Sequence, residues 1–188
     1  MIELKNKYKT GIRRFQYINW IGFFSLYKKE TLRFLNVFGQ TIVGPVVTAV
    51  LFLLVISLAI GEQRSNVLGV PFIQFLAPGL IAMQIIQQAF SHTSSSIMIG
   101  KIQGNIVDIL YAPLSPAEVT LAVILAGVTR SFVIAIFSII VFAFVTELPF
   151  YNFFYIFLYT FLGSFILGAV GFIVGCLLYT SPSPRDGL

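Results

Sequence analysis

The sequence predicts an all-α, polytopic membrane protein in which an N-terminal interfacial amphipathic helix precedes four transmembrane helices. Hydrophobic residues make up 57% of the 188 residues and charged residues only 10%, with a mean hydropathy of +0.93. A soluble domain carries about a quarter charged residues, which keep it in water. The apolar residues are also gathered into stretches of membrane-spanning length. Most of the protein surface is therefore expected to face lipid.

Four stretches are expected to cross the bilayer, at about residues 41–60, 72–99, 116–145 and 150–175. The first contains no charged residue, and about 20 residues of helix cover roughly 30 Å of hydrocarbon. Pro45 lies in its first turn, where a missing N–H costs least. Pro78 and Gly79 are expected to separate a short entry segment from the main helix of the second stretch.

Basic residues before the first span predict the orientation of the chain. There are eight of them, namely Lys5, Lys7, Lys9, Arg13, Arg14, Lys28, Lys29 and Arg33. Only Glu3 and Glu30 offset them in this part of the sequence. Cations that flank a span mark the cytoplasmic side, so we expect a cytoplasmic N-terminus. This distribution accounts for the net charge of +5, and nucleic acid is therefore not expected as a partner.

The interfacial helix is expected at about residues 20–38. Apolar residues recur there mostly at three- and four-residue spacing, at Trp20, Phe23, Phe24, Tyr27, Phe34, Leu35 and Phe38. Polar residues occupy the positions between them, at Lys28, Lys29, Glu30, Arg33 and Asn36. Such a helix can lie in the membrane interface with its cations toward lipid phosphates. A cytosolic amphipathic helix packed on protein is the alternative.

The second span carries a polar face formed by Gln84, Gln88, Ser91 and Ser95. Their four- and three-residue spacing places them on one side of a helix. Amides and hydroxyls in hydrocarbon need partners, so this face either bonds to other helices or lines a translocation pathway. His92 has no partner at metal-ligand spacing and is interpreted as a hydrogen-bonded packing residue.

Arg130 is the one charged residue deep within an expected span. An ionisable residue at membrane depth is a functional-site hypothesis, with a pathway or pairing role. The third stretch is also long enough for its first turns to project from the bilayer, in which case the side chain would snorkel to the headgroups. Both interpretations stay open at this stage.

The loop between the second and third spans contains a short amphipathic stretch. Gly104 and Asn105 supply a turn, Asp108 is its one acidic residue, and Pro113 ends it. A short helix of this kind suits docking into a groove on a soluble partner.

Three strings in order, KKETLRFLNVFGQTIVGPVV, QFLAPGLIAMQ and QGNIVDILYAPLSP, resemble permeases of the type-2 ABC exporter class. The resemblance is nearest to the bacterial multidrug and nodulation-type export branch and covers residues 18–175. It implies a bacterial inner-membrane protein with an interfacial connecting helix. It also implies an ATPase-coupling helix that includes Gln103, Gly104, Asn105, Asp108 and Pro113.

The same resemblance implies six spans, so residues 1–175 are expected to be a partial transmembrane domain that stops after the fourth. The string CLLYTSPSPRD, which begins at Cys176, looks like translated sequencing-adapter read-through. Residues 176–188 are accordingly expected to be non-native, and a natural Ser/Pro-rich tail is the alternative.

The implied function is that of a membrane-spanning subunit that exports a hydrophobic drug-like or lipid-linked substrate. The resemblance implies a second permease chain, with a homodimer favoured, and a separate ABC ATPase subunit that binds ATP. This chain has no GxxxxGK[ST] phosphate loop and no catalytic or metal-ligand constellation, so we expect neither enzymatic activity nor a cofactor of its own. A permease for polysaccharide or another cell-envelope glycan is one alternative, and a non-transporting membrane scaffold is another.

Overall fold

The computed structural model describes residues 18–60, 66–67, 69–146 and 152–178, and these are almost wholly helical. The helices are α1 (Trp20–Leu35), the π-helix η2 (Gly39–Val43), α2 (Gly44–Ile60), α3 (Phe72–Ile102), α4 (Ile106–Tyr111), α5 (Pro116–Val145) and α6 (Phe153–Leu177). Two short strands, β1 (Asn66–Val67) and β2 (Val70–Pro71), form an antiparallel pair between α2 and α3. Four helical stretches in the described residues are long and apolar enough to cross a membrane. The predicted all-α, polytopic fold is confirmed.

The membrane-spanning stretches lie at Gly39–Ala59, Phe72–Ile102, Pro116–Val145 and Phe153–Leu177. The expected separation of α3 at Pro78 is wrong, because α3 is one continuous helix with Pro78 inside it. Proline lacks an N–H and removes one backbone hydrogen bond. Membrane helices tolerate that loss because neighbouring groups satisfy the freed carbonyl.

Several expectations concern residues outside the described ranges. These are the cations Lys5, Lys7, Lys9, Arg13 and Arg14, the start of the fourth expected span at residues 150–151, and tail residues 179–188.

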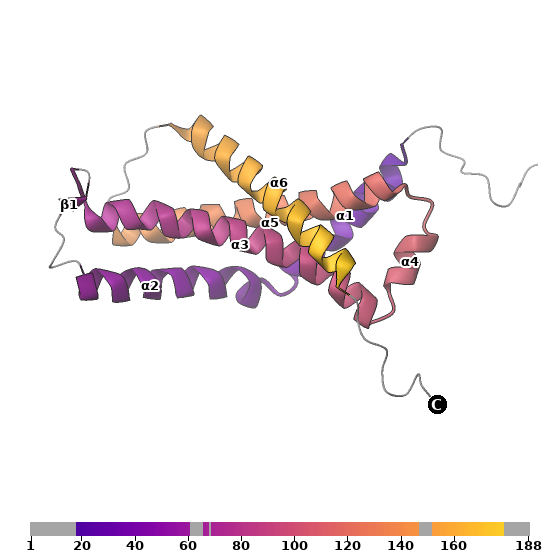
Figure 1. Cartoon of the computed structure of the whole chain (residues 1–188), viewed down its shortest axis with the longest axis horizontal. Coiled ribbons are helices and arrows are strands. Elements are labelled where there is room, and N and C mark those ends of the chain that lie inside the picture. Colours follow the sequence, from indigo (N-terminus) through magenta and orange to yellow (C-terminus); the bar gives the residue numbers. More distant parts are fainter. Residues whose placement is uncertain (1–17, 61–65, 68, 147–151, 179–188) are drawn as a thin grey trace, which may run out of the picture.

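Helix α3 is the central element of the bundle and packs against α2, α5 and α6. Figure 1 shows α4 at one end of the molecule and the β1–β2 pair at the opposite end. We call these the α4 end and the hairpin end. Helix α1 packs along α5 at the α4 end, and α6 crosses α3 obliquely, so that the two diverge toward the hairpin end (Figure 1).

Two apolar clusters hold the helices together. The larger joins α2, α3 and α5 through Ala49, Leu53, Ala77, Leu80, Ile81, Ile85, Ala135 and Phe142. The smaller joins the end of α1 to η2, α2 and α5 through Phe34, Ile42, Val46 and Ile134. Close packing of this kind supplies the attraction between helices where the solvent is as apolar as the side chains.

The passage from α1 into α2 is a helical bend. The amphipathic helix ends at Leu35, before the expected limit of residue 38. Thr41 then donates its hydroxyl to the carbonyls of Phe34 and Val37, at 2.9 and 2.8 Å. The same two carbonyls also accept backbone bonds from the N–H groups of Val37 and Thr41, so the Thr41 hydroxyl adds a second link across the bend. The bend links α1 directly to the first span.

Helices α3 and α6 approach most closely where α6 presents glycine. A Cβ atom built on Gly171 would lie 2.5 Å from the Phe90 carbonyl oxygen, and one built on Gly175 would lie 2.9 Å from the Ser94 carbonyl oxygen. Both distances are shorter than a carbon atom tolerates. Glycine therefore permits this crossing, as small residues do at membrane helix interfaces.

Candidate functional site

The expected coupling segment forms an exposed turn of helix between the two longest spans. Gly104 has φ +75°, a conformation that glycine adopts without strain, and it redirects the chain at the end of α3. Gln103 accepts a hydrogen bond from the Asn105 side chain at 3.2 Å. Asp108 lies exposed in the first turn of α4. The carbonyl of Pro113, just after α4, accepts a bond from Asn19 at 3.3 Å.

Helix α4 presents apolar side chains to the outside. Val107, Leu110 and Tyr111 are 46%, 76% and 86% exposed. Helix α4 stands apart from the spans at its end of the molecule (Figure 1), and none of its residues is buried. A short exposed helix with apolar side chains suits insertion into a groove on another protein.

The predicted polar face of α3 separates into different environments. Gln88 accepts a hydrogen bond from Arg130 at 2.6 Å, which joins α3 to α5. Ser95 donates to the carbonyl of His92 in its own helix. Gln84 is half-buried and Ser91 is exposed. Of the four residues, Gln88 is the one that the structure brings to Arg130.

Arg130 lies between three helical segments. Besides Gln88, its guanidinium group approaches the Thr41 carbonyl in η2 at 3.5 Å. The hydrogen bond to Gln88 pairs Arg130 across α3 and α5. A position near the headgroups and a pathway role both stay predictions.

A second polar cluster was not predicted. Glu30 is only 3% exposed; it accepts a hydrogen bond from Ser96 at 2.7 Å and forms an ion pair with Arg33 at 3.3 Å. Arg33 in turn donates to Ser96 at 3.2 Å. The sequence analysis grouped Glu30 with the polar positions of this helix, and the structure buries its side chain against α3. Leu26, Glu30 and Phe34 share the buried side of α1, and their four-residue spacing was the available signal.

Helix α1 thus packs on protein through one side and exposes the other. Trp20, Phe24 and the two lysines, Lys28 and Lys29, are exposed. His92 is fully buried and meets Phe34 edge to face at 5.7 Å. The described residues give neither of its ring nitrogens a hydrogen bond, so the packing role is observed and the expected hydrogen bond is not.

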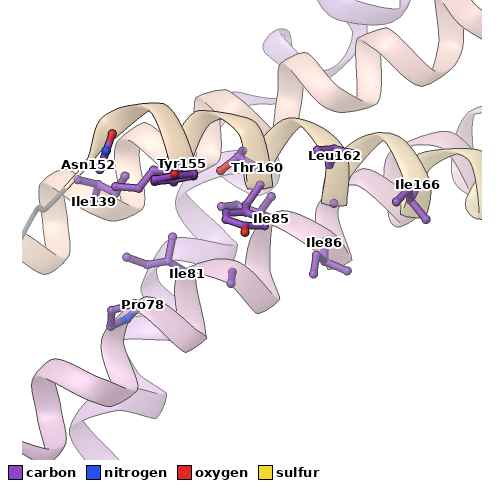
Figure 2. A pocket seen from close by; sticks show the side chains of 14 residues that line it. Pro78, Ile81, Ile85, Ile86, Ile139, Asn152, Tyr155, Thr160, Leu162 and Ile166 are labelled. Atoms are coloured by element: carbon purple, nitrogen blue, oxygen red, sulfur yellow. The ribbon is translucent and has the colours of Figure 1, made fainter.

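An apolar groove of about 800 Å³ lies between α3 and α6 where they diverge. Figure 2 shows Pro78, Ile81, Ile85 and Ile86 on one wall, with Tyr155 and other α6 residues opposite. The groove is lined by none of Gln84, Gln88, Ser91, Ser95 and Arg130. The residues predicted from polarity and the groove between α3 and α6 are therefore separate features.

Residues 21–182 match the family model described as ABC-2 type transporter. The chain belongs to this family. The chain is also 32% identical over 120 residues to the inner membrane transport permease YadH of Escherichia coli strain K12. The same values hold for YadH of Escherichia coli O157:H7 and of Shigella flexneri. The aligned part is 64% of this ABC-2 chain and 47% of each relative, so it spans about half the length of these proteins.

No solved structure matches the chain. The ABC-2 match and the four apolar helices make it a multi-pass membrane protein of a transport-permease family. The match ends at residue 182, and α6 continues through Cys176 and Leu177. The family match and α6 therefore both extend into residues 176–188, the segment expected to be non-native.

Replacing Arg130 by alanine and Gln88 by leucine is expected to reveal an energetic coupling of about 1 kcal/mol. Each single change removes the same interhelical hydrogen bond, so the double variant should be more stable than the sum of the two losses implies. Unfolding of the purified full-length protein in mixed detergent measures the three free energies. Gln84→Leu is the matched control and should be additive with Arg130→Ala. Additive losses for Gln88→Leu would contradict the coupling.

Proposed function

We propose that this ABC-2 chain is the membrane-spanning permease subunit of an ATP-driven exporter in the bacterial inner membrane. The observation that supports this most directly is α4, an exposed apolar helix held between two long spans by Gly104 and Pro113. Such a helix gives a soluble subunit a point at which to move the spans. The family match and the named function of YadH support the transport assignment.

In the proposed complex, two permease chains pair with two ABC ATPase subunits that bind ATP. The N-terminus and the α4 end face the cytoplasm, because basic residues flank the first span on that side. Closure of the ATPase subunits on ATP displaces α4, and α3 and α5 transmit the displacement as continuous helices. The exposed aromatic and basic side of α1 contacts membrane lipid.

The proposed substrate is hydrophobic and drug-like, or lipid-linked. The aliphatic and aromatic lining of the α3–α6 groove supports this class, since an apolar chain would leave few polar groups unpaired there. Asn152 and Tyr155 add a small number of polar atoms near one end of the groove (Figure 2).

The test replaces Gly104 by valine and Asp108 by lysine in the full-length permease expressed with its proposed ATPase partner. Valine at φ +75° is strained by about 1–2 kcal/mol and should displace α4. The lysine reverses the charge at the first turn of α4. Both variants are expected to lose co-purifying ATPase and to lose efflux of the hydrophobic dye Hoechst 33342.

Gly79→Val is the matched control, because Gly79 also has open space around it but lies in α3 without a positive φ. It should retain ATPase binding and efflux. Full ATPase binding and full efflux in the Gly104 and Asp108 variants would contradict the proposed role of α4.

A further inference from the structure

The N-terminus of α1 is hydrogen-bonded to the segment that joins α4 to α5. Asn19, the N-cap residue of α1, is only 3% exposed. Its backbone N–H donates to Glu118 Oε1 at 2.7 Å, and its side-chain nitrogen donates to the Pro113 carbonyl at 3.3 Å. Its side-chain oxygen accepts from the Gly22 N–H at 3.0 Å. Asn19 thus caps α1 and is hydrogen-bonded to both Pro113 and Glu118. We call residues 113–118 the α4–α5 connection.

Glu118 serves two helices at once. Its Oε2 accepts from the Ser115 N–H at 2.6 Å, and the Ser115 hydroxyl accepts from the Glu118 N–H at 3.3 Å. These two bonds form the capping box that begins α5. The other carboxylate oxygen binds Asn19, and the whole residue is 6% exposed. A charged acceptor that is buried and doubly bonded makes a strong and directional contact.

The same region is closely packed. A Cβ atom built on Gly22 would lie 2.7 Å from a methyl carbon of Leu114, so the first turn of α1 lies directly against the connection. Further along, Tyr27 and Thr129 share a hydrogen bond of 2.7 Å between α1 and α5. The start of α1 therefore cannot shift relative to the α4–α5 connection without breaking several contacts.

We infer that Glu118 is a positioning residue that makes α1 move together with the α4–α5 connection. The inference rests on the proposed function, in which ATP displaces α4. Displacement of Pro113 and Glu118 carries Asn19 with them, and α1 passes the movement through η2 into the first span. The Asn19–Glu118 contact thus gives the ATPase subunit a second route into the membrane, beside the direct route through α3 and α5.

The test measures movement of α1 without requiring a known substrate. A single spin label is placed at Ser25 on the exposed side of α1, or at Ala117 at the start of α5, in a cysteine-free full-length permease bound to its ATPase. Double electron–electron resonance gives the separation of the two labels in the paired permease chains. It is recorded without nucleotide and after trapping with ATP and vanadate. Both positions are expected to shift together on trapping.

Asn19→Asp is the main variant. Aspartate is as good an N-cap as asparagine, so α1 keeps its own cap. The donor to Pro113 is lost, and a second carboxylate is placed beside Glu118. The Ala117 shift is expected to persist, while the Ser25 shift is reduced. It is not abolished, because the packing of Gly22 on Leu114 remains. Glu118→Gln offers one acceptor oxygen where two are needed. It is expected to reduce the Ser25 shift in the same way and to leave the Ala117 shift in place.

Three results would overturn the inference. The first is a Ser25 shift that Asn19→Asp and Glu118→Gln leave unchanged. The second is a wild-type complex in which Ala117 shifts and Ser25 does not. The third is a fall of both variants to low membrane levels, because the contact would then serve folding alone. A wild-type complex in which neither position shifts would instead contradict the proposed function.

Discussion

Gly171→Val is expected to lower the free energy of unfolding by about 2–3 kcal/mol, because it overpacks the crossing of α3 and α6. The valine Cβ would meet the Phe90 carbonyl oxygen and the Thr93 hydroxyl. Phe90 contributes a backbone atom there, which cannot rotate away as a side chain could. Thr93 is fully buried and bonded to the Ala89 carbonyl. The helices must therefore separate, and detergent unfolding of the purified full-length protein measures the loss.

Gly163→Ala is the matched control on the same helix. Its nearest neighbour would be an Ile86 side-chain carbon at 3.7 Å, an ordinary contact distance. This variant should remain within experimental error of the wild type. A Gly171→Val protein as stable as Gly163→Ala would show that α6 does not cross α3 at this position.

Glu30→Ala is expected to destabilise the protein by about 2 kcal/mol, because it leaves Arg33 and Ser96 without their shared acceptor. The loss is smaller than for a fully buried pair, since the Arg33 side chain is 35% exposed and partly solvated. The free energy of unfolding again provides the measurement.

Two variants on α1 define what the carboxylate contributes. Lys29→Ala removes an exposed charge from the same helix and should change stability little. Glu30→Gln keeps one oxygen that accepts from Ser96 and should fall between the wild type and Glu30→Ala. Equal stability of Glu30→Ala and Lys29→Ala would show that α1 does not pack against α3 through this cluster.

Helix α1 contacts other helices of the protein as well as exposing a side that can face the membrane interface. Its buried side is bonded to α3 through Glu30 and to α5 through Tyr27. Its other side exposes Trp20 and Phe24. The two interpretations of this segment therefore describe opposite sides of one helix: protein packing is observed on one side, and lipid contact on the other is part of the proposal.

The helical spans were predictable because the signal for a membrane helix is local. The stretch expected at residues 116–145 coincides with α5, since its apolar residues and the Ser115–Pro116 start lie within one continuous segment. The capping box at Ser115 and Glu118 was also visible as a serine followed three residues later by glutamate, and it was missed. The exposed α4 turn could be placed from Gly104 and Pro113 alone.

The class of protein, the approximate spans and the position of the short loop helix were therefore predictable from residue types along the chain. Which polar groups meet depends on how the helices pack in three dimensions. Asn19 and Glu118 are 99 residues apart, and Gln88 and Arg130 are 42 apart. Their pairing depends on how the helices rotate and cross, which is set by close packing at residues such as Gly171. Hydropathy depends on residue type along the chain, whereas these contacts depend on the relative placement of whole helices.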